Sequence, residues 1–254
     1  MQVAAYQAPL LPAGSMGGLE LIRQRVKWCE ANGVEILCCP EAILGGLADY
    51  AKRPHDGAIS PREIESTLSL ISSDIVTTII GFTELAADGE LYNSAAVLHR
   101  GVILGVYRKL HPAINRSVYQ SGSEVPVFEV GTLMFGIIIC NDSNYPDLAR
   151  RLADKGARAL FIPTNNGLPL SRTYADLVCE SRSVDIANAV ANRLWIIRAD
   201  VAGRTDGLMS VGSSAIVDPK GKIVGAARGF NEDLIVADIA TGLLLSRHID
   251  GENS

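Results

Sequence analysis

Three short apolar segments of the sequence run into a residue that can take part in catalysis: Glu41, Lys109 and Cys140. Strand ends are where α/β sheets place ligands, because the strands hold the loops there rigidly. A cysteine thiol has an ordinary pKa of about 8.5, so it is mostly protonated at neutral pH. A neighbouring carboxylate can accept its proton, and a neighbouring ammonium group can stabilise first the thiolate and then the oxyanion of a tetrahedral intermediate. These residue types form a complete set for acyl transfer that needs neither histidine nor metal.

Each of the three residues also has an ordinary structural interpretation. A glutamate after a strand is usually solvated, and Lys109 lies beside Arg108 and His111, as residues of a wet basic surface do. An isolated cysteine is more often a small buried apolar residue than a nucleophile. The catalytic interpretation therefore rests on the way the three types complement one another.

Short apolar runs rich in Val and Ile predict the strands. These runs are Val3–Ala8, Val34–Cys39, Ile75–Phe82, Ala95–Leu98, Val102–Val106, Val125–Val130, Leu133–Ile139, Ala159–Ile162, Leu194–Val201, Ser213–Val217, Ile223–Ala226 and Leu234–Ile239. Apolar residues at three- and four-residue steps from Leu19 to Cys29 predict a helix that Gly33 ends. Three more helices are predicted at Pro61–Ser72, Pro146–Lys155 and Thr173–Asn192.

The connections between these segments predict an α/β protein with mixed sheets. Helix-length connections after the first strand and after Leu133–Ile139 suit crossovers between parallel strands. Tight turns at Arg100-Gly101 and at Asp218-Pro219-Lys220-Gly221 favour antiparallel hairpins. Since no Pro-, Gly- or Ser-rich linker and no internal repeat is present, one domain over residues 1–254 is predicted.

Composition excludes several classes of protein. The 254 residues carry a net charge of −5 and are 48% hydrophobic, which excludes a disordered chain. The lack of a basic run argues against nucleic-acid binding, and no apolar stretch reaches the roughly 18–20 residues that span a membrane. No signal peptide is visible, and five cysteines in mostly apolar surroundings suit reduced thiols, so a cytoplasmic protein is expected. Without a Cys-x-x-Cys pair or clustered histidines, neither a metal site nor a cofactor is expected.

A series of short motifs is spread over almost the whole chain. They are the opening strand ending in Gln7, Cys39-Pro40-Glu41, Asn93-Ser94-Ala95, Tyr107-Arg108-Lys109-Leu110-His111, Gly136-Ile137-Ile138-Ile139-Cys140-Asn141-Asp142 with Pro146, Gly156-Ala157, Pro163-Thr164-Asn165, the helix end from Arg182 to Ala191-Asn192, Gly212-Ser213-Ser214 and Asp218-Pro219-Lys220-Gly221. Glu41 and Lys109 are 68 residues apart, and Lys109 and Cys140 are 31 apart. In these motifs, their order and their spacing, the sequence resembles the nitrilase superfamily of carbon–nitrogen hydrolases, and the shared order makes the resemblance specific.

This resemblance implies a four-layer α-β-β-α sandwich with two mixed sheets, assembled into a homodimer or a larger homo-oligomer. It implies that Glu41 is the general base, Lys109 the oxyanion stabiliser and Cys140 the nucleophile, with the backbone N–H of Asn141 assisting Lys109. Cys140 would attack an amide-like carbon, a thioester would form, and water activated by Glu41 would release the acid.

The sequence departs from the family at one position. Many relatives carry a second glutamate about seven residues before the glycine that matches Gly122, and Asn115 occupies the nearest position here. The only acid nearby, Glu124, lies beyond that glycine. An amide can hydrogen-bond Lys109 but cannot neutralise its charge, so the activation of the site or its substrate range is in question.

The Cys-Asn-Asp motif resembles that of amidases and N-carbamoylases more than that of nitrile hydrolases. We therefore predict a small-molecule amide or N-carbamoyl substrate. Two alternatives stay open: a nitrile hydrolase of the same family, and a catalytically weakened member that serves as a binding or scaffold protein.

Three loops are expected to form the rim of the pocket: Gly45–Ser60, Ala113–Ser123 and Asn165–Arg172. The predicted substrate-binding residues are Asn115, Asn141, Asn165 and Asn166. For at least one of Asn165 and Asn166, simple turn chemistry is the competing interpretation. Two further residues are assigned structural roles: Asp142 is expected to orient loop or backbone groups, and Arg182 to pair with Asp185 at three-residue spacing.

Overall fold

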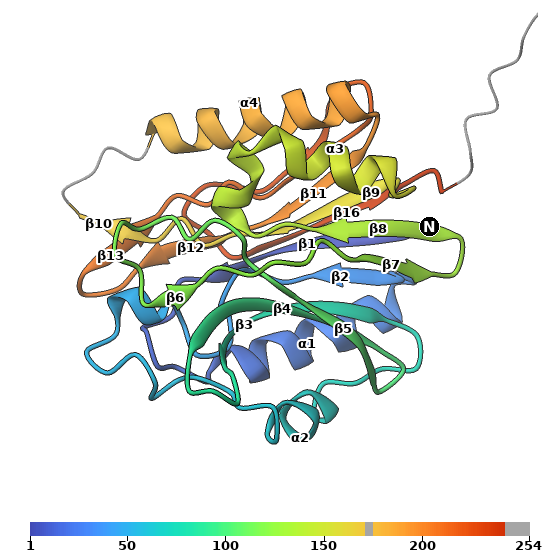
Figure 1. The fold of residues 1–254 in the computed structure, drawn as a ribbon. Helices are drawn as coiled ribbons and strands as arrows, with labels where there is room; N and C mark the ends of the chain where they lie inside the picture. The colour runs from blue at the N-terminus through green and yellow to red at the C-terminus, as the bar shows by residue number, and fades with distance from the viewer. Residues whose placement is uncertain (171–174, 242–254) are drawn as a thin grey trace, which may run out of the picture.

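The computed structural model describes residues 1–170 and 175–241 (Figure 1). Two β-sheets pack face to face, with α1 and α2 outside one sheet and α3 and α4 outside the other (Figure 1). The predicted four-layer α-β-β-α sandwich with two mixed sheets is confirmed. No helix in the described ranges is long and apolar enough to cross a membrane.

The larger sheet has the order β10-β13-β12-β1-β2-β3-β4-β5, with β16 paired to β1 and β6 paired to β4. Its strands are β1 (Gln2–Pro9), β2 (Ile36–Cys38), β3 (Thr77–Leu85), β4 (Leu91–His99), β5 (Val102–Arg108), β6 (Tyr119–Gln120), β10 (Leu168–Pro169), β12 (Val201–Arg204), β13 (Leu208–Ser210) and β16 (Asp233–Asp238). As the connections predict, β1, β2 and β3 run parallel, whereas β3, β4 and β5 form antiparallel hairpins.

The smaller sheet has the order β15-β14-β11-β9-β8-β7. Its strands are β7 (Val127–Val130), β8 (Leu133–Ile137), β9 (Ala159–Pro163), β11 (Trp195–Ala199), β14 (Ala215–Val217) and β15 (Ile223–Ala226). Its central strands β8, β9 and β11 are parallel, and antiparallel strands flank them. Like the larger sheet, the smaller sheet therefore combines parallel strands with antiparallel ones.

The helices agree with the periodicity of the sequence, although their ends differ. They are α1 (Gly18–Ala31), α2 (Ile64–Ser69), α3 (Pro146–Asp154) and α4 (Ala175–Asn192), with short 3₁₀ helices η1 (Ala48–Tyr50) and η2 (Cys140–Asn144). Helix α1 buries the predicted face, including Ile22 and Val26, and Gly33 follows it with a left-handed φ of 73°. Helix α2 is shorter than predicted, and residues 173–174 of the last predicted helix lie outside the described residues.

Alternation along the strands divides the interior into layers. On β1, Val3 and Ala5 face the opposite sheet, whereas Ala4 and Tyr6 belong to the cluster beneath α1 and α2. Side chains alternate in this way because a strand is pleated. Since both faces of β1 are covered, its sequence is a continuous apolar run and shows no alternation of apolar and polar residues. A third cluster lies between the smaller sheet and the helices α3 and α4.

One predicted strand is two strands. The apolar run Leu194–Val201 splits at Asp200, where β11 of the smaller sheet ends and β12 begins in the larger sheet beside β1. The two-residue strands β6 and β10 and the short β13 were not predicted, because segments of two or three residues carry no periodic signal.

Candidate active site

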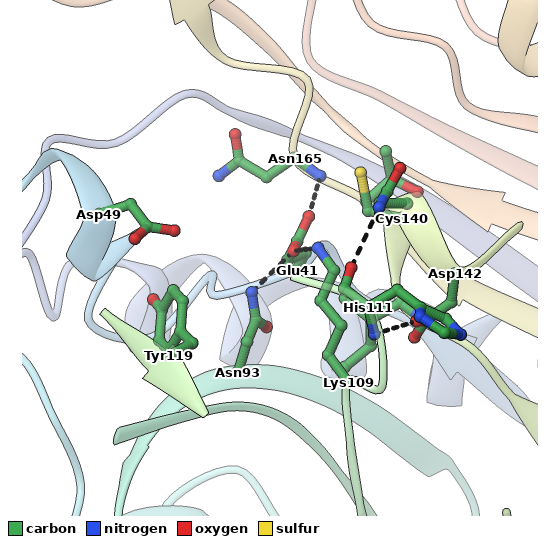
Figure 2. A network of polar contacts seen from close by, with 12 residues as sticks. Glu41, Asp49, Asn93, Lys109, His111, Tyr119, Cys140, Asp142 and Asn165 are labelled. Atoms are coloured by element: carbon green, nitrogen blue, oxygen red, sulfur yellow. Dashed lines mark hydrogen bonds and ion pairs between the residues drawn. The ribbon is translucent and has the colours of Figure 1, made fainter. Parts of the chain in front are cut away.

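The structure brings Glu41, Lys109 and Cys140 together at one cavity of about 690 Å³ (Figure 2). Glu41 follows β2 and Lys109 follows β5, so both come from the larger sheet. Cys140 begins η2 just after β8 of the smaller sheet. The site is therefore assembled across the interface between the two sheets.

The carboxylate of Glu41 is fixed by three donors. Oε1 accepts from Nζ of Lys109 at 2.6 Å and from Nδ2 of Asn93 at 2.7 Å, and Oε2 accepts from the backbone N–H of Asn165 at 2.9 Å (Figure 2). Only 1% of Glu41 is exposed. Gly81 of β3 permits this placement, because a Cβ there would lie 2.3 Å from the carbonyl oxygen of Pro40. Such a carboxylate is held ready to exchange a proton at a fixed position.

Lys109 is charged in spite of its burial. Only 4% of the residue is exposed, and this desolvation lowers the pKa of the ammonium group. The negative charge of Glu41 and the further interactions with Cys140 and Asp142 outweigh it, so the pKa is raised overall. A permanent positive charge beside the thiol suits oxyanion stabilisation.

Cys140 lies at a sharp turn with a left-handed φ of 47°, at the start of η2. A positive φ at a residue with a Cβ is uncommon and is typical of functional positions. The thiol is partly accessible and contacts Oδ1 of Asn166 at 3.8 Å. Burial raises its pKa to about 12, with the charge of Glu41 adding to the rise and those of Lys109 and Arg198 opposing it. The thiol of the free protein is therefore protonated at neutral pH.

Alkylation of Cys140 is expected to keep accelerating as the pH rises past the value of an ordinary thiol. A raised pKa means a smaller thiolate fraction at every pH below it, so the iodoacetamide rate should still increase above the ordinary thiol pKa of about 8.5. The measurement uses a Cys179→Ser background, because Cys179 is exposed and the remaining cysteines are buried. A plateau near the ordinary value would contradict this prediction.

Asp142 ties the segments that carry Lys109 and Cys140 to each other. Its Oδ2 accepts from the hydroxyl of Tyr107 at 2.7 Å and from the backbone N–H of Ile139 at 3.0 Å. Its Oδ1 accepts from the backbone N–H of His111 at 2.8 Å (Figure 2). These partners lie two residues to either side of Lys109 and one residue before Cys140, so the buried carboxylate orients backbone groups, as predicted.

Asp142→Asn is expected to reduce kcat by roughly a hundredfold with a small change in KM, because misplacing reacting groups by a fraction of an ångström acts mainly on the chemical step. An amide presents one acceptor oxygen and one NH₂ group, so the NH₂ group would face a donor that the carboxylate of Asp142 now accepts from. Tyr107→Phe is the graded control, since it removes one donor and leaves both backbone contacts. An Asp142→Asn enzyme with wild-type kcat would show that the hydrogen bonds of Asp142 have no role in positioning Lys109 and Cys140.

A buried ion pair between Arg198 and Asp185 contacts η2 through Ser143. Arg198, which is 2% exposed, donates from Nε and Nη2 to the two oxygens of Asp185 at 2.7 and 2.6 Å. Nη2 also donates to the hydroxyl of Ser143 at 3.1 Å, and that hydroxyl donates to the carbonyl of Cys140 at 2.8 Å. The predicted pair of Arg182 with Asp185 is therefore wrong. A bidentate guanidinium buried in the core is the stronger partner, and Nε of Arg182 has no hydrogen-bond partner within the described part of the chain.

All four predicted substrate-binding asparagines line the cavity, but three of them are engaged elsewhere. Asn141 donates to the carbonyl of His111, and the side chain of Asn165 accepts from the N–H of Gly167 in a turn. Asn166 donates to Asp200 and to Ser213. The remaining polar atom of the Asn166 side chain, Oδ1, contacts the thiol of Cys140. The side chain of Asn165 stabilises a turn, which was the competing interpretation for this residue.

Asn115 is exposed at the rim and has no side-chain hydrogen bond among the described residues, so it does not make the hydrogen bond to Lys109 that an amide at this position could make. The segment around it is held by Asp49 of η1. The carboxylate of Asp49 accepts from the hydroxyl of Ser117 at 2.9 Å and from the N–H of Val118 at 2.8 Å. An acid distant in sequence thus contacts the segment that lacks the second glutamate.

The predicted rim loops contribute to the cavity, with residues 171–172 lying outside the described ranges. Sequence reasoning missed the roles of Asn93, Asp49 and Arg198. The Asn93 motif was noted, but nothing in its spacing shows that its amide contacts Glu41. In the part of the chain that the structure describes, no three His, Cys, Asp or Glu side chains gather as metal ligands.

Comparisons with known proteins agree with this architecture. The model of the carbon-nitrogen hydrolase family matches residues 2–246. A nitrilase of Pyrococcus abyssi is 28% identical over 234 residues, which are 90% of this chain and 85% of that protein. An (R)-stereoselective amidase of Pseudomonas sp. is 27% identical over 203 residues, covering 76% of this chain and 69% of the amidase. The crystal structure of an amidase from Nesterenkonia sp. matches with a TM-score of 0.81 at 22% identity, covering 98% of this chain and 93% of that one.

The fold and the site thus define an enzyme of the class that hydrolyses carbon–nitrogen bonds. Because the family model covers nearly the whole sequence, the chain belongs to the carbon–nitrogen hydrolase family of the nitrilase superfamily. The predicted family membership is confirmed.

Proposed function

We propose that the protein hydrolyses the C–N bond of a small amide or N-carbamoyl compound through a thioester on Cys140. The observation that carries this proposal is the buried contact of 2.6 Å between Lys109 and Glu41 at the cavity that also holds the thiol of Cys140. The similarity to an amidase and the Cys-Asn-Asp motif favour amides as the substrates.

In the acylation half of the proposed reaction, Glu41 takes the thiol proton while the sulfur attacks the carbonyl carbon and forms a C–S bond. The carbonyl oxygen becomes an oxyanion, which the ammonium group of Lys109 and the backbone N–H of Asn141 stabilise. The tetrahedral intermediate then expels its nitrogen. Glu41 returns the proton to that nitrogen, so ammonia or an amine leaves and a neutral thioester remains.

In the deacylation half, water takes the place of the departed amine. Glu41 removes a proton from the water as its oxygen attacks the thioester carbon, and the same groups stabilise the second oxyanion. The C–S bond breaks, the sulfur recovers the proton, and the acid leaves. One carboxylate thus serves both halves, which fits a Glu41 side chain held by three donors in one position.

A nitrile hydrolase is the second candidate, because a nitrilase is among the similar proteins. The test is a panel of short amides, ω-amides, N-carbamoyl amino acids and matched nitriles, with released ammonia as the readout. Intact mass after a rapid acid quench should show the acyl group on the wild-type chain. Faster turnover of nitriles than of amides would favour the second candidate. An absence of both turnover and adduct would favour the scaffold alternative.

A further inference from the structure

Two basic side chains line the cavity in the part of the chain that the structure describes, and buried acids neutralise both. They are Lys109 and Arg198, which are 4% and 2% exposed. Lys109 contacts Glu41 at 2.6 Å, and Arg198 contacts both oxygens of Asp185. A substrate carboxylate would have to displace one of these buried partners, which leaves an uncompensated charge and is unfavourable.

Two acids of the same cavity have no ionic partner within the described chain. Asp49 is partly buried on η1 and accepts only from neutral donors, the hydroxyl of Ser117 and the N–H of Val118. Figure 2 shows its carboxylate turned toward the side of the site that holds Asn165 and Glu41. Glu180 lies exposed on α4 at the edge of the cavity. Among the described lining residues, the formal charge outside the two ion pairs is therefore negative.

A third observation, independent of these acids, concerns a buried acceptor on a residue of the cavity lining. Asn93 is 2% exposed and lines the cavity, and its Nδ2 is used by Glu41. Its Oδ1 is buried and has no hydrogen-bond partner among the described residues. An acceptor left without a donor costs free energy, so the electrostatics near Asn93 favour groups that carry hydrogen-bond donors or positive charge.

From this charge distribution we infer that the enzyme selects amides or N-carbamoyl compounds whose remote end carries a positive charge, such as an ammonium group, and rejects those that carry a carboxylate. This inference rests on the proposed function and specifies its substrate class. Asp49 and Glu180 are the specificity-determining residues. Charge complementarity across a partly desolvated site acts on discrimination between ligands more than on the chemistry itself.

The test compares three amides of equal chain length whose far end is an ammonium group, a methyl group or a carboxylate. We expect kcat/KM to fall in that order, by roughly tenfold at each step. Asp49→Asn keeps an acceptor for Val118 and should reduce the ratio of cationic to neutral substrate by roughly tenfold. Glu180→Gln should reduce the same ratio by roughly threefold, because an exposed charge is screened. Using a ratio cancels any loss of activity common to both substrates.

Asp147→Asn is the matched control, since this exposed acid of α3 pairs with Arg150 outside the cavity and should leave the ratio unchanged. The preference should also weaken as salt is added. Binding of the same three amides to a Cys140→Ala variant, measured by calorimetry, gives a readout that needs no turnover. If no amide is hydrolysed but this variant binds the cationic amide most tightly, the proposed function fails and the specificity inference stands. Equal or tighter binding of the carboxylate amide, no binding of any amide, or ratios insensitive to both substitutions would overturn the inference.

Discussion

Cys140→Ala is expected to abolish hydrolysis, lowering turnover by roughly ten-thousandfold or more while the fold is retained. Without the sulfur the proposed covalent intermediate cannot form, and the remaining groups can only polarise a substrate toward water, which is a far weaker form of catalysis. Ammonia release from the best amide of the panel measures the loss. Circular dichroism and thermal unfolding measure the retention of the fold.

The fold should tolerate this substitution because alanine keeps the Cβ that already occupies the left-handed conformation at φ 47°. The hydrogen bond that is lost is the weak sulfur contact with Asn166 at 3.8 Å. Cys179→Ser is the matched control, since it changes an exposed thiol and should leave turnover intact. Substantial hydrolysis by the alanine variant would show that another group is the nucleophile.

Arg198→Met is expected to lower the free energy of unfolding by about 3–5 kcal/mol. The substitution leaves the fully buried carboxylate of Asp185 without its bidentate partner, and it removes donors from Ser143 and Thr164. A charge stranded in the core is much more unfavourable than a charge that has its partner. Urea unfolding monitored by fluorescence measures the change.

The double variant Arg198→Met with Asp185→Leu separates this explanation from a simple packing effect. Removing both charges together should recover most of the lost stability, because well-packed apolar residues often replace a buried ion pair without penalty. If the double variant is as unstable as the single one, packing or the hydrogen bonds to Ser143 and Thr164 account for the loss instead. The double variant should still have low activity, since Ser143 would no longer be held against Cys140.

Much of the fold could be predicted from the sequence because it depends on local patterns. Apolar runs separated by helix-length connections or by tight turns predicted mixed sheets, and the family resemblance implied that there are two of them in a four-layer sandwich. The division of the run Leu194–Val201 between both sheets could not be seen. Asp200 is the residue at which the chain changes sheets, and its contacts with Asn166 and Ser213 arise from distant segments. A single polar residue in an apolar run does not reveal such a crossing.

The site could be predicted as far as residue types and strand ends allow. Glu41, Lys109 and Cys140 stand at strand ends, so their convergence follows from the topology once the resemblance orders the strands. The supporting contacts do not follow. Helical spacing pointed to Arg182 as the partner of Asp185, whereas Arg198 reaches it from β11 with better geometry. The contact of Asp49 with Ser117 likewise joins residues 68 positions apart, which no local pattern encodes.

The proposed catalytic groups come from opposite sides of the central interface, with Glu41 and Lys109 following strands of one sheet and Cys140 following a strand of the other. Neither half of the sandwich therefore contains a working site, however well its own hydrogen-bonded ladder is formed. Catalytic competence reports on the docking of the two halves rather than on their backbone order. In a loosened, expanded state that keeps its strands and helices but lets the halves slide, hydrolysis would disappear while the far-ultraviolet spectrum stayed nearly native.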